Sequence, residues 1–317
     1  MGIAHYIKEI GRGRDGARSL TRMQAQDLMD QLLGGSLTDL EIGAFALAMR
    51  IKGETVDELA GFLTAAHRHC IELCPTQPTI VLPSYNGARK LPNLTPLLAL
   101  LLAQEGVRVL VHGPMHDAER VTSAEIFRDL GLPFAVDAVE VENAWSRREP
   151  VFMRLDDLCP PLARLLEVRR VVGLRNSGHT VAKVLAPCRS GASLRVVNYT
   201  HPEFAALLKE FLAATHAHAA LLRGTEGEPV ADPRRTPRMD VFIDGCERPD
   251  LSRAAQEGVL TELPVLPRGI DAATTARYIQ AVVSGEKPAP GPLSQQVECL
   301  LRALRAIDLN TPRKQSA

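Results

Sequence analysis

The spacing of hydrophobic residues changes near Pro75, and this change limits what the 317-residue chain can fold into. Before Pro75, apolar residues recur only at helical spacing; after it, short apolar runs alternate with helical segments. This order predicts an α/β protein made of a small all-helical domain and a larger α/β domain with a central, mainly parallel sheet. We place the first domain at residues 1–74, completed by helices within about 145–190, and the second at 75–317.

Cap signals mark the helices of the first 74 residues. Thr55 followed by Glu58 forms a capping box at the start of one helix. Ser19 or Thr21 begins another, and Thr38 begins the next. Glycines at positions 34–35 and 53 end these helices.

Two buried strands follow Pro75. "TIVLP" leads into the loop 83–93, and "VRVLVHG" leads into the loop 112–121. Parallel sheets bind ligands at the carboxyl ends of their strands, so these loops are the candidate site. "LRVVNYT" and "HAALLRG" predict two more strands, whereas 137–190 reads mainly as helices and loops. The remainder looks loose, apart from helices at 271–283 and 293–307.

Bulk properties exclude some classes of function. The 37 basic and 37 acidic residues cancel, so nucleic-acid binding requires charge that is locally segregated. Six scattered cysteines without a CxxC pair predict reduced thiols and a cytoplasmic location. There is no run of about 18–20 apolar residues and no signal-peptide pattern, so we expect no membrane partner.

The order of helical unit and parallel α/β unit resembles the anthranilate phosphoribosyltransferase family, which shares its fold with pyrimidine nucleoside phosphorylases. In that family the first strand ends in Gly-Thr-Gly-Gly-Asp, whose amides hold pyrophosphate; this chain has "PSYNG". The family's Asn-x-Ser-Thr survives in part as Asn93-Leu94-Thr95, and its Lys-His-Gly-Asn as "VHGP". The resemblance implies a vestigial phosphate pocket of Ser84, Asn86, Gly87, Asn93, Thr95, His112 and Gly113.

The family's Asp-Glu pair, which holds Mg²⁺, corresponds to Pro229-Val230 here. Glu226, Glu228 and Asp232 lie nearby, which leaves a displaced magnesium site open. Losing one stabilising donor commonly costs about 3 kcal/mol in the transition state, and several are lost here. We therefore expect no catalytic residues, no metal ligands and no cofactor. The alternative function is Mg²⁺-dependent phosphoribosyl transfer from phosphoribosyl pyrophosphate to anthranilate or another aromatic acceptor.

Longer segments are similar to a narrower group, the YbiB-like branch outside the tryptophan pathway. They include "IKEIGRGRDGARSL", "PSYNGARKLPNLTPLLALLL" and "CPPLARLLEVRRVVGLRNSGHTVAKVLAP". The resemblance implies a homodimer, joined through the helical domain, that binds single- and double-stranded DNA and RNA with little sequence preference.

Local charge agrees with that implication. Residues 164–195 hold seven basic side chains against Glu167 alone. We expect basic groups from three segments to form one groove that contacts phosphates, with Tyr85 and Tyr199 as stacking candidates. The predicted nucleic-acid contacts are Lys8, Arg12, Arg14, Arg18, Arg89, Lys90, Arg169, Arg170, Arg175, Lys183 and Arg195.

Simpler interpretations stay open for each signal. In one interpretation, Arg169 and Arg170 are solvated or paired with Glu167 and nearby acids. In another, which the family resemblance implies for the Val-Arg-Arg segment, one of them holds a small carboxylic acid. In the simpler interpretation, Arg89 and Lys90 belong to an ordinary polar turn, and His112 is a hydrogen-bonded histidine at the edge of the core. His216 and His218 lack a third ligand at zinc-site spacing. For the chain as a whole, the remaining alternative is a purely structural dimer that recruits another protein.

Overall fold

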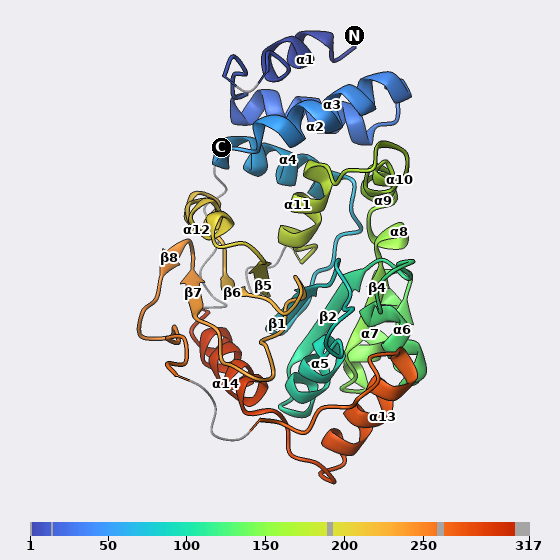
Figure 1. Ribbon diagram of the computed structural model, residues 1–317, viewed down its shortest axis with the longest axis vertical. Helices are drawn as coiled ribbons and strands as arrows, with labels where there is room; N and C mark the ends of the chain where they lie inside the picture. The colour runs from blue at the N-terminus through green and yellow to red at the C-terminus, as the bar shows by residue number, and fades with distance from the viewer. Residues whose placement is uncertain (1, 14, 189–192, 259–262, 308–317) are drawn as a thin grey trace.

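The computed structural model describes residues 2–13, 15–188, 193–258 and 263–307. Four helices form a layer at one end of the molecule (Figure 1). They are α1 (Ala4–Ile10), α2 (Arg22–Leu33), α3 (Asp39–Lys52) and α4 (Val56–Arg68). Further helices pack on this layer: α9 (Pro160–Glu167) against α2, α11 (Ser177–Val184) against α3 and α4, and α12 (Glu203–Ala214) against α4.

Capping boxes begin three of these helices, at Thr21, Thr38 and Thr55. The box at Thr55 also joins helices, because its partner Glu58 is fully buried and accepts hydrogen bonds from Leu20 N at 2.9 Å and Lys52 Nζ at 2.6 Å. A buried carboxylate needs such partners, so one sequence-encoded cap fixes α4 against the segments around it.

The second layer is an eight-stranded sheet in the order β3-β4-β2-β1-β5-β6-β7-β8. All neighbours from β3 to β6 pair in parallel, and β6-β7-β8 are antiparallel. The fold class predicted from the sequence is therefore confirmed. The strands are β1 (Thr79–Pro83), β2 (Arg108–Gly113), β3 (Phe134–Ala135), β4 (Val151–Arg154), β5 (Ser193–Tyr199), β6 (Ala219–Arg223), β7 (Met239–Ile243) and β8 (Cys246–Glu247).

Alternating side chains of β1 supply two hydrophobic cores, one on each face of the sheet. Ile80 and Leu82 pack with α5 (Thr95–Gln104), α6 (Ser123–Asp129), α13 (Ala272–Val283) and α14 (Gly291–Arg305). Val81 joins the core that continues into the helical layer through α11 and α12 (Glu203–Ala214). Figure 1 shows α11 between α4 and the sheet. The remaining helices are α7 (Ala138–Ser146), α8 (Leu155–Leu158) and α10 (Arg169–Val172).

The sequence prediction missed four strands. It read residues 137–190 as helices and loops, yet Val151–Arg154 forms β4 and pairs with β2. It treated the region after residue 230 as loose, yet Met239–Ile243 forms β7. These two segments pair with β2 and β6, and that tertiary pairing decides their conformation more than their local pattern does.

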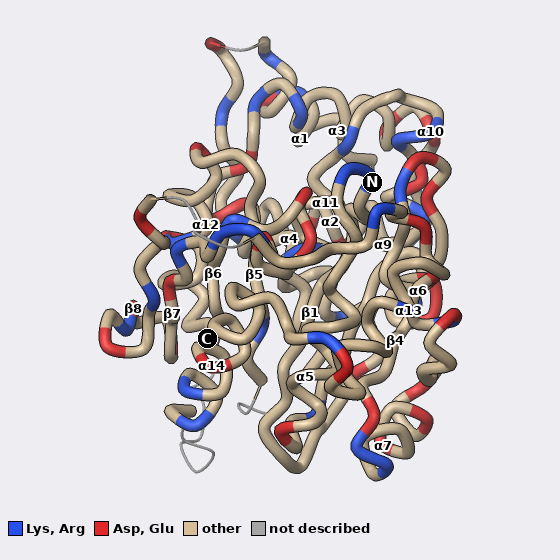
Figure 2. Tube along the Cα trace, turned by 60° about the horizontal axis from the view of Figure 1, so that its bottom comes forward, with Lys and Arg blue, Asp and Glu red and all other residues tan. Residues whose placement is uncertain are grey.

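Charge is mixed over the whole molecule. Figure 2 shows Lys and Arg together with Asp and Glu in both layers of the fold. No helix among the described residues is long and apolar enough to cross a membrane.

Candidate anion-binding site between the layers

A cavity of about 840 Å³ lies between the helical layer and the carboxyl ends of β1, β2, β5 and β6. We call it the interlayer cavity. Its lining includes six cationic side chains and three acidic ones, so its formal charge is positive although the chain as a whole is neutral. The cations are Arg50, Arg89, Lys90, Arg120, Arg175 and Lys183, and the acids are Glu54, Glu203 and Glu226.

Next to this cavity, the loop after β1 presents backbone amides and hydroxyls to a single point. The amides of Asn86 and Gly87 both donate to Glu228 Oε1 at 2.7 Å. The hydroxyls of Ser84 and Thr95 donate to its other oxygen. We call these four donors the amide cradle. A carboxylate of the protein itself thus fills the place where such a loop binds an external anion.

Gly87 is required for this geometry. Its φ of +66° lies in the left-handed region, and a Cβ there would come within 2.9 Å of the Val121 carbonyl oxygen. Any side chain at position 87 would therefore disturb both the loop and its neighbour.

The Thr225–Glu228 turn after β6 carries two carboxylates into the loop after β1. Besides Glu228, it presents Glu226, which accepts hydrogen bonds from the amides of Arg89, Lys90 and Leu91 at 2.9–3.1 Å. Glu226 holds an unusual φ of +52°, and Gly227 follows at +88°. Five hydrogen bonds from backbone amides to the two carboxylates stabilise this tight turn. Both carboxylates are therefore occupied by hydrogen bonds within the protein.

Two basic side chains face the turn from the other side of the interlayer cavity. Arg175 donates from Nη1 to Asn86 Oδ1 at 2.6 Å, which links the start of α11 to the loop after β1. Lys183, on α11, is largely buried, and burial together with Arg175 lowers its pKa to about 8. Among the described residues, none is hydrogen-bonded or ion-paired to the Lys183 ammonium group. The same burial and the same arginine lower the pKa of His179 to about 3, so His179 is neutral.

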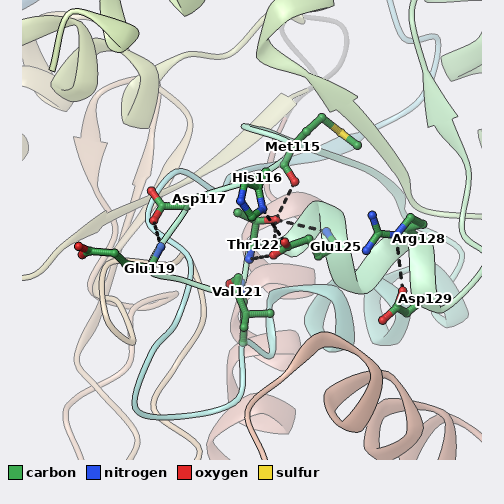
Figure 3. Close-up of polar contacts among 10 residues, drawn as sticks. Met115, His116, Asp117, Glu119, Val121, Thr122, Glu125, Arg128 and Asp129 are labelled. Carbon is green, nitrogen blue, oxygen red and sulfur yellow. Dashed lines mark hydrogen bonds and ion pairs between the residues drawn. The ribbon is translucent and has the colours of Figure 1, made fainter. Parts of the chain in front are cut away.

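The loop after β2 brings Arg120 to the interlayer cavity. Its guanidinium donates to the Gly87 carbonyl at 3.3 Å, and Val121 pairs with Ala88. The loop is fixed to α6, since Thr122 donates to the Met115 carbonyl while Glu125 accepts from Thr122 N at 2.8 Å and contacts His116 Nδ1 (Figure 3). Arg120 is thus held in place by a short, capped connection.

The predicted vestigial pocket divides into two groups. Ser84, Asn86, Gly87 and Thr95 converge on Glu228, while Asn93 supports them by accepting from Thr95 N. His112 faces away: Nδ1 lies 2.7 Å from the Tyr85 hydroxyl, and burial lowers its pKa to about 4. Gly113 lies so close to the Ser84 carbonyl that a side chain would not fit.

Stacking on Tyr85 was a wrong expectation. Its ring is buried and its hydroxyl is used by His112, so no base can reach it. Tyr199 does line the interlayer cavity, and so does Phe204, which the sequence prediction did not include.

Of the predicted nucleic-acid contacts, the structure brings together Arg89, Lys90, Arg175 and Lys183. Three others lie outside the interlayer cavity: Lys8 is exposed on α1, and Arg12 and Arg18 pair with Glu9. Arg14 lies outside the described residues.

Three more predicted contacts have partners within the protein. Arg169 pairs with Asp117 at 2.6 Å and Arg170 with Glu167 at 2.5 Å, as the simpler interpretation of this segment anticipated for Arg170. Arg195 is buried and donates to the Val184 carbonyl at 2.7 Å. A single groove that includes all three segments is therefore a wrong expectation.

Sequence reasoning missed Arg50, Arg120 and Asn198, which all line the interlayer cavity. Arg120 could have been found, because it falls in the loop after the second strand, one of the two loops singled out as the site. Asn198 could also have been found, because it lies near the carboxyl end of the predicted strand "LRVVNYT". Arg50 carries no such signal, since the end of its helix reaches the cavity only through packing.

The donor set fits poorly to a magnesium–pyrophosphate ligand. Glu226 and Glu228 are bonded to amides, and Asp232 is paired with Arg234 at 2.8 Å. The described residues contain no cluster of three or more His, Cys, Asp or Glu side chains able to hold a metal ion.

Residues 4–70 match the family described as the glycosyl transferase family, helical bundle domain. Over most of its length the chain is similar to the protein YbiB of Escherichia coli (strain K12), with 39% identity over 306 residues that cover 96% of this chain and 94% of YbiB. It is also similar to an anthranilate phosphoribosyltransferase of Methanopyrus kandleri, with 29% identity over 297 residues, 91% of this chain and 85% of that protein.

Solved structures share the fold. The crystal structure of anthranilate phosphoribosyltransferase from Thermus thermophilus has a TM-score of 0.71 at 21% identity, covering 96% of this chain and 90% of that one. The enzyme from Saccharomyces cerevisiae in complex with PRPP and Mg has a TM-score of 0.67 at 15% identity, covering 96% and 93%.

Proposed function

This chain belongs to the YbiB-like branch of the anthranilate phosphoribosyltransferase family, and on that premise we propose that it binds nucleic acid in the interlayer cavity without catalysing phosphoribosyl transfer. The observation that carries the proposal is the excess of cationic over acidic side chains in that cavity, within a chain of zero net charge. Phosphates of a strand neutralise such groups whatever the base sequence.

Aromatic side chains support the same proposal. Tyr199 and Phe204 line the interlayer cavity beside its cations, and Phe204 is 40% exposed. Bases of a single strand stack on such rings without regard to sequence. Cations that hold phosphates and rings that hold bases together suit a single-stranded segment.

The occupied amide cradle argues against phosphoribosyl transfer. Pyrophosphate would have to displace the Glu228 carboxylate from four donors, and like charge would oppose its approach. A leaving pyrophosphate would also lack the amides that stabilise it in the transition state.

Fluorescence anisotropy tests the proposal. Labelled single strands of unrelated sequence should bind with similar affinity, and the logarithm of the association constant should fall linearly with the logarithm of the salt concentration, by roughly 0.7 for each phosphate neutralised. Negligible binding at low salt would refute the proposal.

Magnesium-dependent phosphoribosyl transfer is the second candidate, favoured by similarity to the anthranilate phosphoribosyltransferase of Methanopyrus kandleri. Calorimetry with phosphoribosyl pyrophosphate and Mg²⁺ separates the two candidates. We expect no Mg²⁺-dependent heat of binding from wild-type protein, because cations of the interlayer cavity can hold the 5-phosphate of this ligand without a metal. Tight binding that requires Mg²⁺ would favour the second candidate over loss of catalysis.

We also propose that the functional form is a homodimer. On α3, Leu40, Leu47 and Ile51 are 84%, 47% and 57% exposed, and their spacing of seven and four residues puts them on one face of the helix. A stripe of this kind is unusual on a monomer, and burying it against the same stripe of a second copy would remove it from water.

A further inference from the structure

The lining of the interlayer cavity includes a side-chain amide that has no hydrogen-bond partner among the described residues. Asn198, the penultimate residue of β5, is only 2% exposed, yet neither its Oδ1 nor its Nδ2 makes a hydrogen bond within the described structure. Leaving a buried amide unsatisfied is costly, so such a group commonly marks the place of a ligand.

Asn198 and Lys183 flank the same turn. The Asn198 Cβ would lie 3.0 Å from a side chain at Gly224, and the Lys183 ammonium 3.3 Å from one at Gly227. Across the turn, Arg175 reaches Asn86. We call Arg120, Arg175, Lys183 and Asn198 the Lys183 subsite.

Charge at the Lys183 subsite is uncompensated. Arg120 and Arg175 each disfavour the protonated form of Lys183, and only Glu228 opposes them. Glu228 already accepts four hydrogen bonds in the amide cradle. Three cations against one carboxylate leave a formal surplus of two positive charges, which a dianion would neutralise.

We propose that the Lys183 subsite binds a terminal phosphate monoester, with Lys183, Arg175 and Arg120 holding its two negative charges and Asn198 hydrogen-bonding the attached group. A monoester phosphate carries up to two negative charges near neutral pH, whereas an internal phosphodiester carries only one. Asn198 is 2% exposed, whereas Arg89 and Lys90 in the same cavity are exposed, so the end of a chain reaches Asn198 more easily than the middle of a strand does.

If the phosphate monoester is the 5′ end of a nucleic-acid strand, this inference rests on the proposed function. The same chemistry is presented by a free nucleoside monophosphate, and Tyr199 lines the same cavity to hold the base of either ligand. The experiment therefore has two arms.

In the first arm, one short single strand is prepared with a 5′-phosphate or a 5′-hydroxyl, labelled at its 3′ end and titrated by anisotropy. Wild-type protein should bind the phosphorylated strand about tenfold more tightly, which corresponds to 1.4 kcal/mol. Lys183→Met and Asn198→Leu should each abolish this preference, and Lys183→Met should also lower the affinity for both strands, because Lys183 is one of the cations of the interlayer cavity. Arg89→Met is a matched change at an exposed residue of the same cavity. It should weaken the binding of both strands equally and keep the preference for the phosphorylated one.

In the second arm, adenosine 5′-monophosphate is titrated by calorimetry into wild type and Lys183→Met. Binding by wild type alone, with no binding of either strand, would support the Lys183 subsite while refuting nucleic-acid binding. Equal affinity for both strands with no binding of the monophosphate would overturn the subsite and leave the proposed function standing. A phosphate preference that survives in both Lys183→Met and Asn198→Leu would also overturn it. The unfolding transition of each variant shows whether it is folded.

Discussion

The carboxylate of Glu228 lies 2.7 Å from the backbone nitrogen of Gly87, although 141 positions separate the two residues in sequence. The bond closes the amide cradle from inside, beside a cavity whose cations stay open to ligands. The Thr225–Glu228 turn therefore separates two anion sites: the amide cradle, which Glu228 already fills, and the cationic interlayer cavity, which can accept an external anion.

Removing that carboxylate should both destabilise the protein and create an anion site. Glu228→Ala leaves buried donors at Asn86 and Gly87 without acceptors, at about 1–3 kcal/mol each, and each kcal/mol lowers the melting temperature by about 2–4 °C. Pyrophosphate should then raise the melting temperature of the variant by more than that of wild type, because only the variant offers the amide cradle in addition to the cations of the interlayer cavity, as scanning fluorimetry would show.

Glu226→Ala is the matched control. Its amide partners at Arg89 and Lys90 are exposed, so water replaces the carboxylate and the loss should be smaller. Equal losses for the two variants, or no response of Glu228→Ala to pyrophosphate, would contradict the idea of an internally filled cradle.

Replacing Lys183 should stabilise the free protein. The folded pKa of about 8 lies below the usual 10.5, so the buried charge disfavours folding below pH 8, and this cost disappears as pH rises from 8 to 10.5. Lys183→Met should therefore melt at a higher temperature than wild type at pH 7, and the gap should narrow by pH 10.

The groups facing Lys183 are Arg175, Arg120 and Glu228, with neutral His179 on the same helix. They are present in both proteins, so the comparison reports the loss of the ammonium group. If the two melting temperatures are equal at pH 7, or if their difference increases with pH, the Lys183 ammonium group does not destabilise the folded protein.

Arg89→Glu combined with Lys90→Glu should weaken single-strand binding by an order of magnitude or more and reduce its salt dependence. Both side chains are exposed, so the melting temperature should change little. Lys8→Glu with Arg12→Glu makes the same change of charge outside the interlayer cavity and should have a much smaller effect. Similar losses in the two double variants would mean that overall charge, not the cavity, controls binding.

Leu47→Glu should convert the proposed dimer to a monomer at micromolar concentration, measured by light scattering, because it places a charge in the apolar stripe of α3. Val139→Glu, at a residue of α7 that is 67% exposed, should leave the mass unchanged. A wild-type protein that is already monomeric would remove the dimer from the proposal.

The sequence by itself determined the local structure. The threonines at 21, 38 and 55 cap their helices, and the runs at 79–83 and 108–113 form adjacent parallel strands. Caps and hydrophobic periods depend on neighbours a few residues away, which is why they can be recognised in the sequence. Short strands such as β4 could not, because they depend on partners far along the chain.

The candidate site was only partly encoded in this way. Sequence reasoning grouped Ser84, Asn86, Gly87 and Thr95, but it left Glu228 as one possible metal ligand among several. Only the tertiary structure decided that Glu228 fills their cradle and that Lys183 has no hydrogen-bond or ion-pair partner in the part of the chain that the structure describes. Hydrogen bonds and desolvation depend on distances of a few ångströms between remote segments, and such distances exist only once the sheet and the helical layer have packed together.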